Sequence, residues 1–138
     1  IPVPDHMQGR SVLPLASGRP SDWPEEAFVQ ISESQVARAI RTERYKYGVV
    51  AADKDGWRDA GSDVYEEAAL YDLHADPYEL DNLIHMERYG EVLEDLRARL
   101  IARMVQAGEP APTIVPHRRE PNRGRVPDVG MLRKPGAH

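Results

Sequence analysis

Residues 36–51 read VARAIRTERYKYGVVA, and this stretch decides the fold. Two runs within it have a period of two: Val36, Arg38 and Ile40 alternate with Ala37, Ala39 and Arg41, and Tyr45, Tyr47 and Val49 alternate with Lys46, Gly48 and Val50. Such a period places successive side chains on opposite faces of a strand, so the stretch predicts two antiparallel strands joined as a hairpin. The connection Thr42-Glu43-Arg44 has no Asn-Gly or Asp-Gly pair, and we therefore expect a loop that is longer than a tight turn, or bulged.

Further strands flank the hairpin on both sides. Residues 27–32 contain Phe28-Val29-Gln30-Ile31, whose aromatic and β-branched side chains predict a strand. Residues 52–63 are crowded with Asp and Gly, which favour turns, and are predicted to form a loop. A short strand is expected at about 70–73, followed by His74-Ala75-Asp76-Pro77. The residue before Pro77 is kept out of helical geometry, so no helix can begin before that proline.

One long amphipathic helix is predicted from Met86 to Ala107. Its apolar residues recur at spacings of three and four, which places them on one face. They are Tyr89, Val92, Leu93, Leu96, Leu100, Ile101 and Met104. Gly108 and Pro110 end the helix. The elements together predict an α+β unit in which a small antiparallel sheet of about four strands packs against this C-terminal helix.

Two proline-rich arms flank the unit and set its boundaries. Residues 1–26 hold five prolines and are interpreted as a connecting segment, with one helical turn that Ser11 is expected to cap. Residues 27–108 form the subdomain. Residues 109–138 hold six prolines and are interpreted as an extended basic tail.

The net charge of -5 is unevenly distributed. The tail has six basic and three acidic residues, which gives it +3 and leaves -8 for residues 1–108. An acidic body excludes nucleic acid as a partner, because phosphates require clustered Lys and Arg. No apolar stretch reaches the roughly 20 residues of a membrane-spanning helix, so no membrane partner is expected. The tail is a candidate contact between copies in a homo-oligomer.

The start of the chain and its cysteine content leave the compartment open. The chain begins Ile1-Pro2-Val3 without an initiator methionine or an apolar signal segment, which is interpreted as a cut inside a longer protein. Cysteine is absent, and a protein without thiols survives in either redox environment.

Three strings carry a resemblance to a known family. Residues 38–47 read RAIRTERYKY, close to the pattern R-x-x-R-T-x-x-Y-K-Y, and residues 70–83 read LYDLHADPYELDNL, close to L-Y-D-L-x-x-D-P-x-E-x-x-N-L. Residues 9–15 resemble a G-x-S-L-x-P-L segment, with Val12 where leucine is commoner. The chain therefore resembles the C-terminal region of an arylsulfatase-like sulfatase of the alkaline phosphatase superfamily, and residues 1–26 would lead out of a missing catalytic domain.

This resemblance implies a hydrolase of sulfuric esters. The family uses formylglycine, made from Cys or Ser in a C/S-x-P-x-R motif, beside a divalent metal that is expected to be calcium. The chain has no cysteine, and its Ser17-Gly18-Arg19-Pro20 has the residues in the wrong order. No catalytic residue and no metal ligand is therefore carried over, and the chain alone is predicted to be inactive. The implied partner is the sulfatase catalytic domain, expected upstream of Ile1.

Charged residues of the two longer strings are predicted to have structural roles. They are Arg38, Arg41, Arg44, Asp72, Asp76 and Glu79. We hypothesise that Asp72 or Glu79 pairs with one of the three arginines across the sheet. Asp76 is expected to cap a turn, with Pro77 and Glu79 in the first turn of a helix.

Trp57 and Arg58 are the candidates for substrate access. An exposed Trp beside Arg can line a pocket for an anionic or sugar substrate, whereas the alternative is a Trp folded onto its own domain. A calcium loop at 53–63 is disfavoured, because glycine stands at its fourth place and not at its sixth. The five histidines are dispersed and are interpreted as surface residues.

The expected function is that of a sulfatase C-terminal subdomain that completes the fold and shapes substrate access, while hydrolysis takes place on upstream residues. One alternative is the C-terminal part of a related phosphodiesterase or phosphonate monoester hydrolase. The other is a stand-alone interaction module. A docked subdomain taken by itself should expose an apolar patch well above a few hundred Å², and a self-sufficient module should not.

Overall fold

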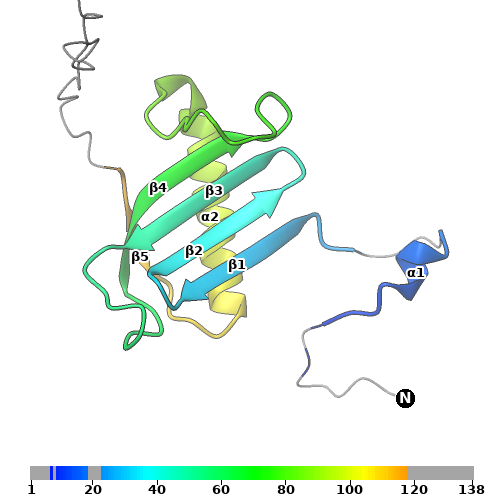
Figure 1. The fold of residues 1–138 in the computed structure, drawn as a ribbon, viewed down its shortest axis with the longest axis horizontal. Helices are drawn as coiled ribbons and strands as arrows, with labels where there is room; N and C mark the ends of the chain where they lie inside the picture. Colours follow the sequence, from blue (N-terminus) through cyan, green and yellow to red (C-terminus); the bar gives the residue numbers. More distant parts are fainter. Residues whose placement is uncertain (1–6, 8, 19–22, 118–138) are drawn as a thin grey trace, which may run out of the picture.

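A computed structural model describes residue 7 and residues 9–18 and 23–117 of the chain. It contains one sheet with a long helix packed on one of its two faces (Figure 1). The strands are β1 (Glu26–Ser32), β2 (Val36–Thr42), β3 (Tyr45–Ala51), β4 (Val64–Asp72) and β5 (Thr113–Val115), and the long helix is α2 (Gly90–Gln106). A four-residue helix, α1 (Leu13–Ala16), precedes the sheet, and a short 3-10 turn (Glu87–Tyr89) precedes α2. The predicted α+β fold class is confirmed.

The strands lie in the order in which they occur in the sequence. The first four are antiparallel neighbours, while β5 runs parallel to β4, so the sheet is mixed and has one strand more than predicted. The predicted hairpin is β2 and β3, with Ile40 opposite Tyr47. Its connection is tighter than predicted, because the Thr42 hydroxyl accepts a hydrogen bond from the Tyr45 N–H at 2.8 Å and leaves only Glu43 and Arg44 between the strands.

The core lies between α2 and the sheet. The buried residues of the helix are Leu93, Leu96, Leu100 and Met104, and each contributes about 1.5–3 kcal/mol on burial. Against them pack the buried strand residues Val36, Ile40, Tyr47, Val49 and Leu70. The helix begins later than predicted, because residues 87–89 form the 3-10 turn before it.

Strand β4 is much longer than the predicted strand at 70–73. It begins at Val64 and includes Glu66 and Glu67, two acidic residues that sequence propensity disfavours in a strand. Glu67 is nevertheless only 3% exposed, because the Tyr47 hydroxyl donates to it at 3.0 Å and the Arg97 guanidinium at 2.5 Å. The tertiary partners therefore override the local preference.

The two arms differ in part from their predictions. The helical turn α1 exists, but Val12 is its N-cap, and the Ser11 hydroxyl accepts only a 3.3 Å hydrogen bond from the Leu13 N–H. Part of the predicted tail, Thr113–Val115, belongs to the sheet as β5. Residues 118–138, which hold all the basic residues of the tail, lie outside the described residues. Among the described helices, none has the length and apolar character to cross a membrane.

Candidate functional site

One face of the sheet has no layer on it within the described part of the chain. Figure 1 shows the long helix behind the sheet, and the opposite face is turned toward the viewer. Strand alternation directs Ala37 and Ala39 of β2, and Gly48 and Val50 of β3, away from the helix-facing residues. We call this surface the open face, and define it by these residues with Val29, Ile31, Ala68 and Ala69.

The open face is apolar and shallowly hollowed. Its large side chains, Val29 and Ile31, are 44% and 39% exposed. A hollow of about 230 Å³ lies over it. Arg38 is the only charged residue at this hollow among the described residues, and its side chain is buried in contacts described below. A surface of this kind fits aliphatic side chains and does not fit a charged ligand.

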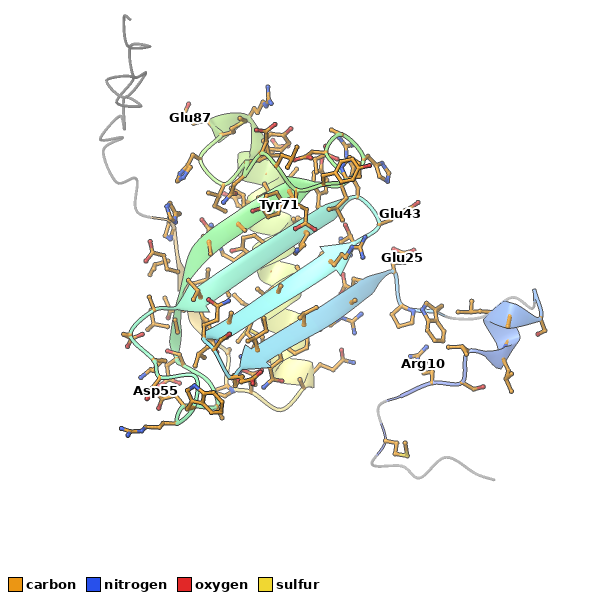
Figure 2. All side chains as sticks on the ribbon, viewed as in Figure 1. Arg10, Glu25, Glu43, Asp55, Tyr71 and Glu87 are labelled. Carbon is orange, nitrogen blue, oxygen red and sulfur yellow. The ribbon has the colours of Figure 1, made fainter. Side chains whose placement is uncertain are left out.

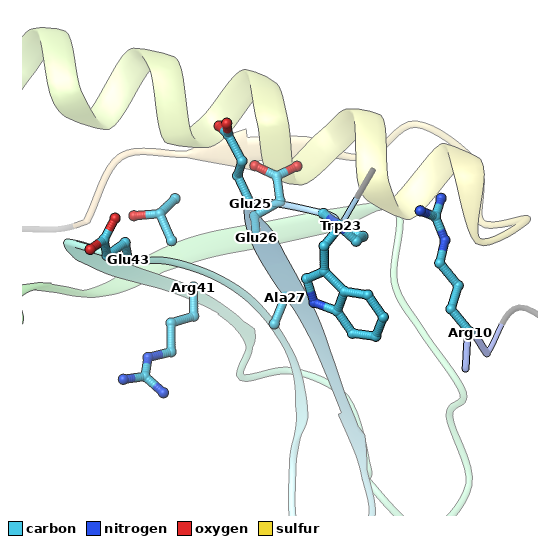
Figure 3. Close-up of a pocket in the computed structure, with 9 residues that line it drawn as sticks. Arg10, Trp23, Glu25, Glu26, Ala27, Arg41 and Glu43 are labelled. Atoms are coloured by element: carbon cyan, nitrogen blue, oxygen red, sulfur yellow. The ribbon is translucent and has the colours of Figure 1, made fainter. Parts of the chain in front are cut away.

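A second hollow, of about 610 Å³, lies at one end of β1 (Figure 3). Trp23, just before the strand, lies beside Ala27 at this hollow, and Arg41 of the neighbouring strand also lines it. Ala27 is opposite Arg41 in the sheet register. Glu26 instead pairs with Arg99 and Arg103 of α2, so Ala27 and Arg41 lie on the side of the sheet that the helix does not cover.

The predicted access residues Trp57 and Arg58 lie in the loop at 52–63, at one end of the sheet, where Figure 2 labels Asp55. Trp57 is 81% exposed and the Arg58 side chain is 85% exposed. The predicted alternative, a Trp folded onto its own domain, is therefore wrong within the described structure. Arg58 lies 3.6 Å from Asp55, which partly neutralises it.

The loop is nevertheless held firmly at its base. The Asp55 side chain accepts a hydrogen bond from the Trp57 N–H at 2.9 Å, and the Ser32 hydroxyl donates to the Ala60 carbonyl at 2.9 Å. Gly56 lies so close to the preceding β1–β2 turn that a Cβ there would be 2.4 Å from the Glu33 carbonyl oxygen. The exposed Trp57 thus stands on a rigid base.

Arg38 is the buried anchor of this end of the molecule. It is 2% exposed, and its guanidinium pairs with Glu109 at 2.8 Å. The same side chain donates to the carbonyls of Ile31, Ala37 and Ala60, the last at 2.7 Å. It therefore ties β1, the 52–63 loop and the segment after α2 together. Sequence reasoning predicted a structural role for Arg38 but missed Glu109.

At the opposite end, the second string forms a turn that closes over β3 and β4. Asp72 accepts hydrogen bonds from Arg44, with the closest contact at 2.8 Å, as one of the hypothesised pairings required. The bonded Arg44 guanidinium holds the pKa of the Asp72 carboxyl below its ordinary value, against the opposing effect of burial. Arg41 is exposed and lines the hollow at Trp23.

The predicted helical turn after Asp76 does not form. Asp76 accepts from the Asp81 N–H at 2.8 Å and so closes a wider turn. Glu79 has a φ of 57°, in the left-handed region that a helix excludes, and its carboxylate pairs with Lys46 at 2.5 Å and not with an arginine. The tertiary pairing with Lys46 explains why a motif with good helix-start residues forms a turn.

A third surface hollow, of about 460 Å³, lies beside α2 and is lined by Glu67, His85, Arg97 and His117. The two histidine rings meet edge to face at 4.6 Å, and His117 lies 3.7 Å from Glu66. Throughout the described residues no three His, Cys, Asp or Glu side chains come together to hold a metal ion. The divalent metal that the resemblance implies is expected in the catalytic portion and not among these residues.

The comparisons with known proteins agree with the fold. Residues 1–106 match the family described as N-sulphoglucosamine sulphohydrolase, C-terminal. The structure of BT4656 in complex with its substrate D-glucosamine-2-N,6-O-disulfate is 25% identical over 78% of this chain, with a TM-score of 0.64. A candidate sulfatase from Bacteroides thetaiotaomicron VPI-5482 is 23% identical over 79% of the chain (TM-score 0.60), and BT1596, described as a 2-O GAG sulfatase, is 23% identical over 78% (TM-score 0.59).

The lengths of these proteins differ from that of the chain. The chain spans 22% of the length of each of the three solved structures. No curated protein matches it.

Proposed function

The chain belongs to the N-sulphoglucosamine sulphohydrolase C-terminal family, and we propose that it serves a sulfuric ester hydrolase as its C-terminal subdomain, completing the fold and shaping substrate access while other parts of the polypeptide carry the catalytic residues. The family match over residues 1–106 carries this proposal. Formylglycine and a divalent metal would supply the nucleophile and the charge for hydrolysis in the catalytic portion, and no step of that chemistry is assigned to this chain.

The loop that carries Trp57 and Arg58 is our candidate for the access role. A Trp that is 81% exposed on a rigid base offers an apolar plane against which a sugar ring can stack. Arg58 offers donors for a sulfate group, although Asp55 competes for them at 3.6 Å. The substrate in the BT4656 complex is a sulfated glucosamine, which supports a sulfated saccharide as the substrate class for this chain's parent enzyme.

The proposal is tested by the polypeptide that naturally contains residues 1–138. We expect the sequence upstream of Ile1 to contain a C/S-x-P-x-R motif, and the complete polypeptide to hydrolyse an aryl sulfate or a sulfated saccharide. The 138-residue chain alone should show no turnover with any divalent metal. Hydrolysis by the isolated chain, or an upstream region without the motif, would contradict the proposal.

The same measurement separates the alternatives. Turnover of a phosphodiester or phosphonate ester in preference to the sulfate ester would indicate the related phosphoester hydrolases.

Trp57→Ala should raise the KM for a sulfated saccharide without changing the unfolding free energy of the chain, because the side chain is 81% exposed. Glu43→Ala, an exposed change at the opposite end of the sheet, is the matched control.

A further inference from the structure

Resting on the proposed function, we propose that the open face of the sheet is the surface on which the catalytic body of the hydrolase packs. By catalytic body we mean the part of the polypeptide that precedes this subdomain. The contact is the open face of the sheet, and the outer side of α2 is not part of it.

The chemistry of the two outer sides of the molecule points to this choice. A sheet that faces water on one side normally alternates apolar and polar residues, with the polar ones outside. Here the outward positions along most of the central strands are Ala37, Ala39, Gly48 and Val50, and the charged pair of positions Arg41 and Lys46 lies only at the end next to the β2–β3 turn. The outer side of α2, in contrast, exposes Glu91, Glu94, Asp95 and Ala98. The helix side is therefore suited to water and the open face to a protein.

The path of the chain supports the upstream polypeptide as the occupant. The residues that lead into β1 pass Trp23, which lies beside Ala27 at the end of the sheet that borders the open face (Figure 3). Further upstream, α1 has no buried residue, and its Leu13 and Leu15 are 73% and 43% exposed. Two apolar features thus lie on the route by which a preceding body would join the sheet.

The size of the matching proteins supports the same occupant. This chain corresponds to 22% of BT4656, so most of such a protein is available to cover the face. Val29 and Ile31 line the hollow of about 230 Å³ and would belong to the apolar core of the contact. The hollow has no exposed charge in its lining among the described residues, so a charged or nucleic-acid occupant does not fit it.

Hydroxyl-radical footprinting of two samples tests the proposal. One sample is the 138-residue chain, and the other is the natural polypeptide that contains it. We expect labelling of Val29, Ile31 and Val50 to fall several-fold in the longer polypeptide. Labelling of Val105, which is 49% exposed on α2, should stay the same in both samples.

A pair of variants separates docking from folding. Ala39→Glu places a charge on the open face, and Ala98→Glu is the matched change on the exposed side of α2. In the longer polypeptide, Ala39→Glu should restore the labelling of Val29 and Ile31 and split thermal unfolding into two steps, while Ala98→Glu keeps the wild-type behaviour. In the isolated chain both variants should keep the wild-type Tm, which shows that the subdomain still folds.

Each other outcome overturns the proposal. If the longer polypeptide is an active hydrolase but labels Val29 and Ile31 as the isolated chain does, the docking surface is wrong and the proposed function stands. If labelling of the isolated chain falls as its concentration rises, the occupant is a second copy. If no hydrolase lies upstream, the proposed function and this inference fail together.

Discussion

Arg38 shows how one buried cation organises several segments. Its guanidinium reaches Glu109 and three backbone carbonyls, and it also lies 5.7 Å from the centre of the Tyr65 ring. A buried ion pair adds little net stability over an apolar pair, but removing one partner leaves the other charge without compensation. The loss of Arg38 would therefore affect stability mainly by leaving the Glu109 carboxylate and the three carbonyls without their partner.

Arg38→Met should destabilise the chain by about 3–5 kcal/mol, because it leaves the Glu109 carboxylate and three carbonyl oxygens without their hydrogen bonds from Arg38. The measurement is the free energy of unfolding in urea. Arg41→Met is the control, since Arg41 is exposed on the same strand and should change stability by no more than about 0.5 kcal/mol. Equal effects of the two variants would contradict the anchoring role of Arg38.

The Asp72 carboxylate makes stability depend on pH. Its pKa is lowered in the folded state by the hydrogen bond from Arg44, and the Ala75 and His74 N–H groups act in the same direction. The unfolded state therefore binds more protons in acid. This contribution is fully present above the ordinary value of 3.8 and is lost as the pH falls through the lower folded value.

We therefore expect Asp72→Asn to flatten the acid limb of a plot of unfolding free energy against pH. Asp53→Asn is the control, because Asp53 is 75% exposed and contacts Lys54 only at 3.8 Å. An unchanged acid limb in Asp72→Asn would show that the pairing contributes nothing to folding. Part of the acid limb should remain in Asp72→Asn, because Glu26 also has a lowered pKa in the folded state. Burial raises the pKa of Glu26, but the hydrogen bonds from Arg103 and Arg99 outweigh burial and lower this pKa.

At the scale of the element, α2 is the covering layer of the sheet. Its buried positions Leu93, Leu96, Leu100 and Met104 follow the predicted spacing of three and four. Sequence periodicity could predict this helix and the β2–β3 hairpin, because each repeats one pattern over many residues. It could not predict the first half of β4, since Glu67 is stable in the core only through Tyr47 and Arg97.

Leu100→Ala tests the contribution of α2. The side chain is fully buried, so its loss should cost about 2–5 kcal/mol, including the cavity that remains. Val105→Ala on the same helix is the control, because Val105 is 49% exposed and should change the unfolding free energy by no more than about 0.5 kcal/mol. A comparable loss in both variants would contradict the view that the buried face of α2, and not its exposed side, stabilises the fold.

At the scale of the whole molecule, a covered face and an open face divide the structure. The strings of residues 38–47 and 70–83 indicated the family from sequence. The open face was visible only in part, as small residues at alternate strand positions (Ala37, Ala39 and Gly48), which strand propensity alone does not explain. The left-handed Glu79 and the short strand β5 were also beyond sequence reasoning. Both depend on neighbours that are distant along the chain, namely Lys46 and β4.

The parallel strand β5 has a consequence for biosynthesis. It pairs with β4 only after α2 has been made, so Val64 meets Thr113 across nearly fifty intervening residues. Residues 113–115 must therefore leave the ribosome before this edge of the sheet can pair. Until then the β4 edge of the nascent subdomain is unpaired, and such an exposed edge is a binding site for chaperones.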